Sequence, residues 1–576
     1  MRLILHYLKN YKKLFLLNVI SVFGFALVEL GIPTIVAQMI DNGVNMGDTG
    51  YIWRQGGVIA VISVAGVLGT VLLGYCCARI SSSVTSDIRD DVFDKAQSFS
   101  HREFNQFGVS SMITRTNNDA FQIQLFLNVL LRTALMTPVM IVVSFAMTLR
   151  TSLELSLVIA STIPVIVLGV IFVAKKSKPI SENQQASLDL LNRISRENLN
   201  GIRVIRAFNN DRYEQERFNQ GNNTYMKYSK RIFKLMTLTQ PTFFFLMNLA
   251  ALGIFWVASV MIGAQQLQVG KLVAFMDYLF HAMFSMMLFC TVFMMYPKAE
   301  VSANRIRELL KTEPDIVSAP GAIPLENGVE SVAFDHVTFV YPGGEEAVLR
   351  DISFEVKKGE TIAFIGSTGS GKSTLVSLLP RFYDVSAGAV RINGRDLREY
   401  DLYSLRDAIG FIPQKAMLFS GTIADNIRFG KEDASMEEVV QAAKTAQAYE
   451  FITEKPAGFE EQITENATNI SGGQKQRLSI ARALVRKPDI YVFDDSFSAL
   501  DFKTDAQLRR ALKSVTQEAV VMVVAQRVSS IMDADRIVVL NEGEVVGMGT
   551  HRELLSDCPI YREIAASQLS EKELMI

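Results

Sequence analysis

Cysteine is scarce in this chain, which contains only four among its 576 residues. Cys76, Cys77 and Cys290 lie in apolar runs, and Cys558 lies near the C-terminus. Their spacing matches neither a metal-binding cluster nor the framework of a disulfide-rich secreted domain. The first residues also lack a small-residue cleavage site, so we expect no removable signal peptide.

Charged residues are also few. They make up 20% of the chain and leave a formal net charge of −1, which favours neither a nucleic acid nor an acidic molecule as partner. Hydrophobic residues reach 49%, with 36 Phe and 23 Met, and they concentrate before about residue 300. This composition is too apolar for an ordinary soluble enzyme and predicts an N-terminal half embedded in a membrane.

The apolar residues form six long runs, each near or above the ~20 residues with which a helix crosses a bilayer. The runs cover residues 14–40, 57–79, 128–149, 155–174, 237–263 and 270–297. Lysine and arginine are frequent in segments 79–127 and 175–236, whereas the loop at 41–56 holds only Arg54. By the positive-inside rule the two basic segments are cytoplasmic, and an even number of spans returns the chain to the cytoplasm.

Both basic segments keep helical periodicity with mixed charge, so we expect the spans to continue as helices beyond the bilayer. Each segment contains a break, at 101–108 and at 209–214. Short transverse helices at these tips would suit contact with another domain, and exposed loops are an equally good interpretation. After the last run, the composition predicts a charged helix at 298–311 and a linker with Pro and Gly at 312–328.

A few polar residues fall inside the predicted spans, notably Glu29 and Asp277. Intramembrane charges are costly and usually face a cavity or a partner, so Glu29 could meet a cationic substrate. A role in helix packing is an equally good interpretation. The last two spans are rich in Phe and Met, among them Phe244 and Met286. Such side chains can repack around varied apolar ligands, but they can also simply face lipid or neighbouring helices.

The most informative stretch lies between a short apolar strand predicted at 361–365 and the apolar start of a helix. It reads Gly366-Ser367-Thr368-Gly369-Ser370-Gly371-Lys372-Ser373-Thr374, which fits the phosphate-loop pattern GxxxxGKS. Glycines let backbone N–H groups wrap a phosphate chain, and the following helix adds the positive end of its dipole. Lys372 can reach the outer phosphates, and the Ser373 hydroxyl can bind Mg²⁺. The chain is therefore predicted to bind ATP or another nucleoside triphosphate.

A series of further motifs surrounds this loop. They are Phe339-Val340-Tyr341-Pro342, Phe411-Ile412-Pro413-Gln414, Ile470-Ser471-Gly472-Gly473-Gln474-Lys475-Gln476-Arg477, Ile490-Tyr491-Val492-Phe493-Asp494 and Ser498-Ala499-Leu500-Asp501. With these motifs in this order, the chain resembles one half of an ATP-binding-cassette (ABC) exporter along nearly its whole length. The resemblance implies an all-α six-span transmembrane domain at 1–315, a linker at 316–330 and an α/β P-loop ABC nucleotide-binding domain at 331–576.

The resemblance also implies how ATP and Mg²⁺ would be held. Tyr341 would stack on the adenine, and the phosphate loop would hold the phosphates. Gln414 would ligate Mg²⁺ and sense the membrane domain, while Asp494, the Walker B carboxylate, would hold the metal's shell together with Ser373.

A second group of residues would serve the opposite subunit. The signature motif, Ser471, Gly472, Gly473 and Gln474, opens a helix and in this family grips ATP held by the other cassette. Segment 498–501 matches the loop that crosses the dimer interface, and Glu465 resembles an acid that touches the other subunit's membrane helices. A functional site thus needs two cassettes arranged head to tail.

Two positions depart from the family pattern. Asp495 stands where the family usually has Glu, the base that polarises the attacking water, and its side chain is shorter by one methylene. Misplacement by about 1 Å can cost ~100-fold in rate. Gln526 stands where the family has a switch histidine, and an amide cannot titrate or carry positive charge. Together the two residues predict a degenerate site that binds ATP and hydrolyses it poorly.

An intact signature beside a degenerate site implies a partner chain whose own catalytic residues are complete. The chain thus resembles one subunit of the heterodimeric bacterial multidrug exporters. This predicts a multi-pass protein of the plasma (inner) membrane that exports small amphipathic substrates, with a cytoplasmic ATP-binding domain and main hydrolysis at the site loaded by the partner. A lipid or peptide exporter and a regulatory ATP-binding membrane subunit are the alternatives. A DNA-repair-type ATPase head shares the cassette motifs but not the six spans.

Overall fold

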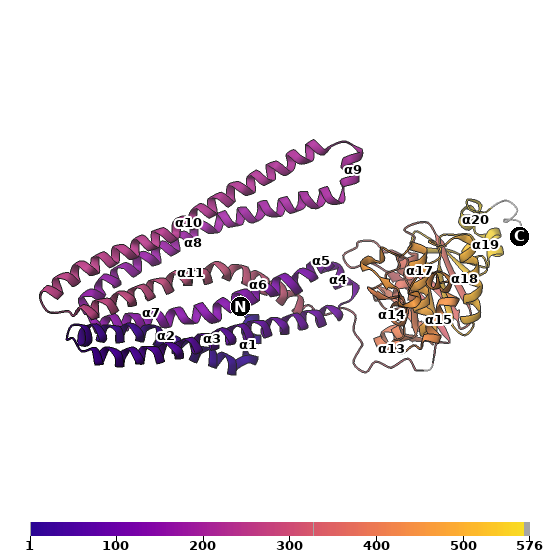
Figure 1. Cartoon of the computed structure of the whole chain (residues 1–576). Helices are drawn as coiled ribbons and strands as arrows, with labels where there is room; N and C mark the ends of the chain where they lie inside the picture. The colour runs from indigo at the N-terminus through magenta and orange to yellow at the C-terminus, as the bar shows by residue number, and fades with distance from the viewer. Residues whose placement is uncertain (1, 327, 570–576) are drawn as a thin grey trace. The chain divides into compact units, whose positions relative to one another are not determined.

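The computed structural model describes residues 2–326 and 328–569, apart from some side chains in helices α8 (Leu153–Asn200) and α11 (Val269–Lys311). It divides into two compact units. The first comprises residues 1–97 and 109–312, and the second comprises residues 98–108 and 313–576 (Figure 1). A short segment near residue 100 therefore belongs to the C-terminal unit, although residues on both sides of it belong to the first.

The described part of the first unit is helical apart from its connecting turns. Besides α8 and α11 it contains α1 (Arg2–Leu8), α2 (Lys12–Gln38), α3 (Thr49–Gln97), α5 (Val109–Thr114), α6 (Ala120–Val129), α7 (Leu135–Thr151), α9 (Ile202–Ala207) and α10 (Asp211–Gly263). Three short π-helical turns interrupt the series: η2 (Met39–Val44), η3 (Arg115–Asp119) and η4 (Leu130–Ala134). Each turn inserts extra backbone into a helix and thereby changes which side chains face inward.

Among the described residues, five stretches are long and apolar enough to cross a membrane. They are Arg2–Val44, Thr49–Gln97, Val109–Thr151, Asp211–Gly263 and Val269–Lys311. The remaining predicted span, 155–174, lies in α8 where several side chains fall outside the described part of the chain, so the count of six stays a prediction. Helices α3, α8 and α10 have 49, 48 and 53 residues. At ~1.5 Å per residue each is about two and a half times as long as a bilayer core is thick, which confirms that helices continue beyond the spans.

The two predicted breaks have different outcomes. The first is the short helix α4 (His101–Phe107), whose start is capped by Ser100 and Glu103. The second break begins at Asn209 as predicted, but the short helix beside it is α9, at Ile202–Ala207, ahead of 209–214. The break falls at Asn209, whose φ of 53° ends the helical run, and Asp211 already opens α10. An acidic residue in the first turn of a helix is favoured by the helix dipole, which explains why α10 already begins at Asp211, inside the predicted break.

The helices pack in two groups that Figure 1 shows side by side within the unit. Helices α2, α3, α7 and α11 pack together, whereas α8 and α10 run alongside each other and are joined through α9. One buried cluster joins α2, α7 and α11 and includes Leu30, Met140 and Tyr278. Another joins α10 and α11 and includes Phe243 and Phe275. Apolar faces buried between helices thus hold the bundle, while the outward faces stay apolar as in a membrane-embedded protein.

The end of α2 is fastened to the start of α11 by one carboxylate. Asp41 is buried in the turn η2, and its Oδ1 accepts a hydrogen bond of 2.8 Å from the backbone N–H of Gly270. A Cβ atom on Gly270 would stand only 2.2 Å from the carbonyl oxygen of Ala37 and 2.7 Å from the Asp41 carboxylate. Only glycine fits this close approach.

The second unit is a mixed α/β domain with three sheets. Its strands are β1 (Ser331–Phe339), β2 (Leu349–Lys357), β3 (Thr361–Gly366), β4 (Ala387–Ile392), β5 (Arg395–Asp396), β6 (Ile409–Ile412), β7 (Gly421–Thr422), β8 (Gln462–Ile463), β9 (Ile490–Asp494), β10 (Val520–Val524), β11 (Arg536–Asn541) and β12 (Glu544–Gly549). Its helices, besides α4, are α12 (Lys372–Leu378), α13 (Leu402–Asp407), α14 (Ile423–Arg428), α15 (Met436–Thr445), α16 (Tyr449–Thr453), α17 (Gly472–Arg486), α18 (Phe502–Val515), α19 (His551–Asp557) and α20 (Pro559–Ala566).

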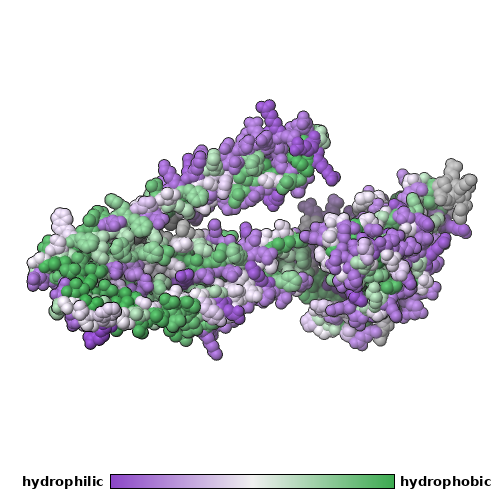
Figure 2. All heavy atoms as spheres, viewed as in Figure 1, coloured by the Kyte–Doolittle hydropathy of each residue, from purple (hydrophilic) through white to green (hydrophobic). Residues whose placement is uncertain are grey.

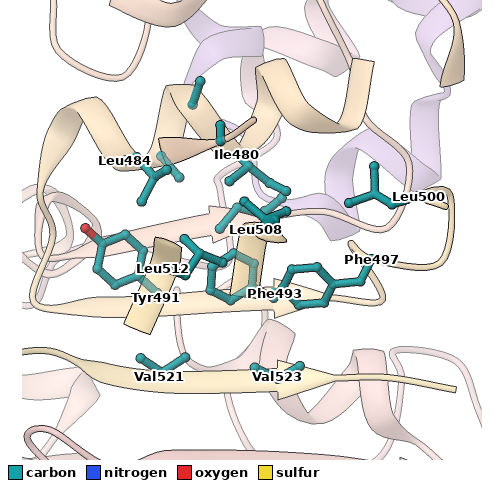
Figure 3. Packing of buried hydrophobic residues seen from close by; sticks show 14 of the residues in the cluster. Ile480, Leu484, Tyr491, Phe493, Phe497, Leu500, Leu508, Leu512, Val521 and Val523 are labelled. Carbon is teal, nitrogen blue, oxygen red and sulfur yellow. The ribbon is translucent and has the colours of Figure 1, made fainter. Parts of the chain in front are cut away.

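The largest sheet has the order β12-β11-β3-β10-β9-β6, and every pairing in it is parallel except that of β12. Strands β9 and β10 are buried along their whole length, as continuous apolar runs in parallel sheets are. Figure 3 shows how Ile480 and Leu484 of α17 and Leu508 of α18 pack over Phe493 and Val523 of these strands. The parallel strands place their carboxyl ends, where ligands bind in such folds, at one edge of the sheet.

Candidate functional site

The phosphate loop leaves the end of β3 and enters α12. Gly366 has a φ of 157° and packs so closely against β11 that a Cβ atom would lie 2.0 Å from the carbonyl oxygen of Leu540. Lys372 lies at the first turn of α12, where its Nζ donates hydrogen bonds to the carbonyl oxygens of Gly366 and Ser367 at 2.9 and 2.7 Å. Burial lowers the pKa of the Lys372 ammonium, and the nearby Asp495 and Asp494 carboxylates oppose that shift. An anionic phosphate beside Lys372 would favour its charged form in the same way.

Ser373 and Asp494, two of the residues predicted to hold Mg²⁺, lie in contact with each other. The Ser373 Oγ donates a hydrogen bond of 2.7 Å to Oδ1 of Asp494, which stands at the end of β9. Burial raises the pKa of the Asp494 carboxyl above its ordinary value, against this hydrogen bond from Ser373. A hydroxyl and a carboxylate are the hard oxygen ligands that Mg²⁺ prefers, and it usually takes its remaining ligands from phosphates and water. The residues present therefore fit Mg²⁺ bound together with ATP.

Three predicted site residues from separate parts of the chain meet at one oxygen atom. Oδ2 of Asp495 accepts a hydrogen bond from Nε2 of Gln414 at 3.1 Å and another from Nε2 of Gln526 at 2.9 Å. The Asp495 side chain is buried, and its backbone has a φ of 48°. Because two amide donors occupy the lone pairs of Oδ2, that oxygen is not available to accept a proton from water. The side-chain amide oxygen of Gln414 takes no part in this hydrogen bond, so it is the atom of Gln414 that could ligate a metal.

The predicted adenine site is a cavity beside the phosphate loop. The hydroxyl of Tyr341 is 2.9 Å from Oγ1 of Thr374, and its ring meets that of Tyr383 edge to face at 5.3 Å between centroids. The cavity has a volume of about 510 Å³. Its other lining residues include Arg102, Asn105 and Gln106 of helix α4, besides Pro342 and Gly343. The sequence motifs indicated Tyr341, and the break at 101–108 suggested contact with another domain, but no sequence signal indicated that residues of α4 line this cavity.

Helix α4 packs, through its first residues, against the rest of the second unit. The His101 ring stacks on Phe382 at 4.6 Å, and Arg102 makes an ion pair of 2.9 Å with Asp315. Burial lowers the pKa of His101, and the nearby Arg406 guanidinium lowers it further. The neutral imidazole is therefore the form that this packing favours.

The signature residues lie apart from the chain's own phosphate loop. Ser471 caps the start of α17, where its backbone N–H donates to Oε1 of Gln474 at 3.1 Å and its Oγ accepts from the Gln474 N–H at 3.4 Å. Gly472 and Gly473 follow at the first turn of the helix. Within the described part of the chain, no hydrogen bond or ion pair joins residues 471–474 to residues 366–374.

The four predicted substrate residues fall into different surroundings in the first unit. Glu29 is half-buried, with Oε1 at 3.9 Å from Nδ1 of His281 on α11. Asp277 is half-buried on α11, and Phe244 on α10 is 41% exposed. Met286 packs against the apolar cluster of α10 and α11. Glu29 therefore lies on α2 and faces α11, whereas Phe244 lies on α10 and Met286 on α11.

Comparison with protein families matches both units. The model of the ABC transporter transmembrane region fits residues 15–288, and the model described as ABC transporter fits residues 349–498. An uncharacterised ABC transporter ATP-binding protein of Bacillus subtilis, YfiB, is 38% identical, and the match covers 99% of this chain and 98% of YfiB. The chain belongs to the ABC transporter family. It is an ABC exporter half, with a helical transmembrane domain followed by an ABC nucleotide-binding domain, as the motifs predicted.

Other relatives of this ABC exporter half carry more specific names. The putative multidrug export ATP-binding/permease protein YgaD of Bacillus subtilis is 31% identical, with 99% of each chain covered. The ATP-dependent lipid A-core flippase of Pasteurella multocida is 30% identical, with 95% of this chain and 94% of the flippase covered. Among solved structures, a bacterial Atm1-family ABC exporter with ATP bound matches with a TM-score of 0.82 and 26% identity, over 96% of this chain and 98% of that one.

Proposed function

We propose that this ABC exporter half is the degenerate-site subunit of a heterodimer that exports apolar or amphipathic compounds. Its own site would bind ATP and Mg²⁺ and hydrolyse ATP slowly. The observation that carries this proposal is the position of Asp495, whose Oδ2 lies between the amides of Gln414 and Gln526. A general base needs a free lone pair at hydrogen-bond distance from water, and this carboxylate is short and has one of its two oxygens engaged by amide donors.

The intact signature motif supports a partner with a complete catalytic site. Ser471 and Gln474 cap each other, so the start of α17 is held ready to face a phosphate. Because no hydrogen bond or ion pair in the described part of the chain joins residues 471–474 to this chain's own phosphate loop, we infer that they complete the ATP site of the second cassette. ATP bound between the two cassettes would draw them together, and hydrolysis at the partner-loaded site would release them.

The tip formed by α9 and its flanks also supports a second chain. Leu199, Val204, Phe208 and Tyr213 are 75%, 60%, 77% and 62% exposed. An apolar patch at a predicted cytoplasmic tip is typical of a protein contact. We infer that the partner's ATP-binding unit covers it, whereas α4 packs against the ATP-binding unit of its own chain.

The class of substrate rests on composition and on relatives. The Phe- and Met-rich helices α10 and α11 suit varied apolar molecules, and one relative is named as a putative multidrug exporter. Another relative is named as a lipid A-core flippase, which favours lipid as the alternative substrate. We place the protein in the plasma (inner) membrane with its ATP-binding domain in the cytoplasm, because the basic segments flank that side.

The test compares ATP hydrolysis in proteoliposomes by the chain alone and by the chain co-expressed with a related half-transporter. We expect turnover only from the pair. Ser471→Ala should lower that turnover by ~10-fold or more, because a donor to the developing phosphate charge is lost. Asp495→Asn should change it by less than ~2-fold. Full activity of the chain alone that Asp495→Asn abolishes would overturn the proposal, and a pair unaffected by Ser471→Ala would point to a regulatory subunit.

A further inference from the structure

An open groove between α2 and α3 is the second cavity of interest in the described part of the chain. It has a volume of about 360 Å³, within the ~300–1,000 Å³ typical of small-molecule sites. Its walls are mainly apolar, with Phe25, Val28 and Ile32 on α2 and Val67 and Val71 on α3. Figure 2 shows that hydrophobic side chains dominate the surface over these two helices. The groove therefore offers an apolar body of small-molecule size a place to bind within a predicted span.

Close packing of the two helices shapes this groove. A Cβ atom on Gly66 would stand 2.6 Å from Cγ1 of Val28, so the glycine is what lets α3 approach α2. One turn further along α3, the Thr70 hydroxyl donates a hydrogen bond of 2.9 Å to the Gly66 carbonyl oxygen. The hydroxyl oxygen of Thr70 can still accept a hydrogen bond. Val67 and Val71 are 63% and 65% exposed, so the groove opens to the outside of the described unit.

A single carboxylate lies in this apolar groove. The side chain of Glu29 lines it and is 39% exposed. Among the described residues its only ion pair is the contact of 3.9 Å with His281, whose imidazole is charged only when protonated. A carboxylate within a span is costly unless a cation compensates it, and no lysine or arginine of the described chain forms an ion pair with it. The groove thus holds one carboxylate beside an apolar surface, and among the described residues the only side chain that pairs with it is a histidine.

We propose that the groove binds an amphipathic organic cation, with Glu29 as its counter-ion and Phe25, Val28 and Val71 against its apolar body. The proposal rests on the proposed export of amphipathic compounds and names the class of compound that this chain recognises. A lipid without a cationic group would gain no charge pairing from the carboxylate, and an anionic lipid would be repelled by it. Charge complementarity therefore selects the cation.

The test measures binding of tetraphenylphosphonium to the full-length chain in phosphatidylcholine nanodiscs. Glu29→Gln keeps the shape of the side chain and removes its charge, and we expect it to weaken binding by ~10-fold or more. Glu154→Gln removes a carboxylate from the exposed start of α8, outside the groove, and should leave the affinity unchanged. Val71→Trp should block the groove and weaken binding of the cation as well. The neutral analogue triphenylphosphine oxide should bind wild type and Glu29→Gln equally.

Several outcomes would overturn the proposal. These are equal affinity of wild type and Glu29→Gln for the cation, an equal loss for the neutral analogue, or binding to the chain alone that the partner chain abolishes by covering the groove. ATP affinity measured on each variant verifies that it is folded. Its failure differs from failure of the proposed function: a pair that exports neutral dyes without any effect of Glu29→Gln would refute the groove alone, whereas a pair that exports nothing would refute the function.

Discussion

Restoring the two residues that depart from the family pattern should turn the site of this chain into an active one. The change is Asp495→Glu combined with Gln526→His. In the structure the two amides hold Oδ2 of Asp495 at 3.1 and 2.9 Å, away from a free approach to water. Glutamate extends the carboxylate by about one C–C bond, ~1.5 Å, and histidine replaces one of the two amide donors.

The expected gain follows from geometry. A misplacement of about 1 Å can cost ~100-fold in rate, and a well-placed general base contributes ~100-fold or more. We therefore expect the double variant of the chain alone to hydrolyse ATP ~100-fold faster than wild type, which corresponds to ~2.7 kcal/mol of activation free energy. Each single variant leaves one defect in place and should gain less than ~10-fold, because residues that act as a unit are not additive.

The assay is steady-state ATP hydrolysis by the purified chain in nanodiscs at saturating Mg²⁺ and ATP. Lys372→Ala added to the double variant is the control, since it removes the ammonium of the phosphate loop and should abolish the gain. The reasoning is refuted if wild type already hydrolyses ATP as fast as the double variant does and the Asp495→Asn substitution abolishes that activity. In that case the shorter carboxylate is a working base despite its two amide partners.

Two further predictions concern packing and pH. Gly270→Ala should destabilise the chain by ~1–3 kcal/mol through overpacking, whereas Gly69→Ala, within α3 and with open space around it, should be neutral or slightly stabilising in the same thermal-unfolding assay; equal effects would show that Gly270 is not confined. Packing lowers the pKa of His101, so its stabilising contribution should be complete above the ordinary value of ~6.5 and should be lost as the pH falls through the lower pKa of the folded state. His101→Phe keeps an aromatic ring on Phe382 and should remove this part of the pH dependence of unfolding; an unchanged pH profile of the variant would contradict the assignment.

The sequence predicted best what is continuous along the chain. Strand β3, the phosphate loop and the start of α12 follow one another within residues 361–378, so the pattern itself gave their order. Strand β9 could be recognised as a buried run ending in Asp494 for the same reason. In both places neighbouring residues determine the local structure, and the spacing of apolar residues carries the necessary signal.

Features that depend on distant residues were beyond the reach of periodicity. Gln414, Asp495 and Gln526 come from three different elements, and only the family resemblance grouped them before the structure placed them together. The three π-helical turns were not predicted, because one inserted residue hardly changes an apolar pattern over a long helix. Even so, the turn η3 buries Asp119, which accepts a hydrogen bond of 2.6 Å from Ser302 of α11. Such tertiary contacts, rather than local propensity, fix these details.

The membership of α4 in the C-terminal unit has a consequence for how these exporters can be taken apart. The chain passes between the two units three times, near residues 97, 108 and 312. A cut after residue 312 would yield a fragment that lacks residues 98–108, and so leaves Phe382 without the ring of His101 and Asp315 without Arg102. Residues 313–576 alone are therefore not a complete domain that can be exchanged between proteins. A chimera that swaps residues 313–576 between two such proteins must also swap the eleven residues 98–108 if the recipient is to keep its surface covered.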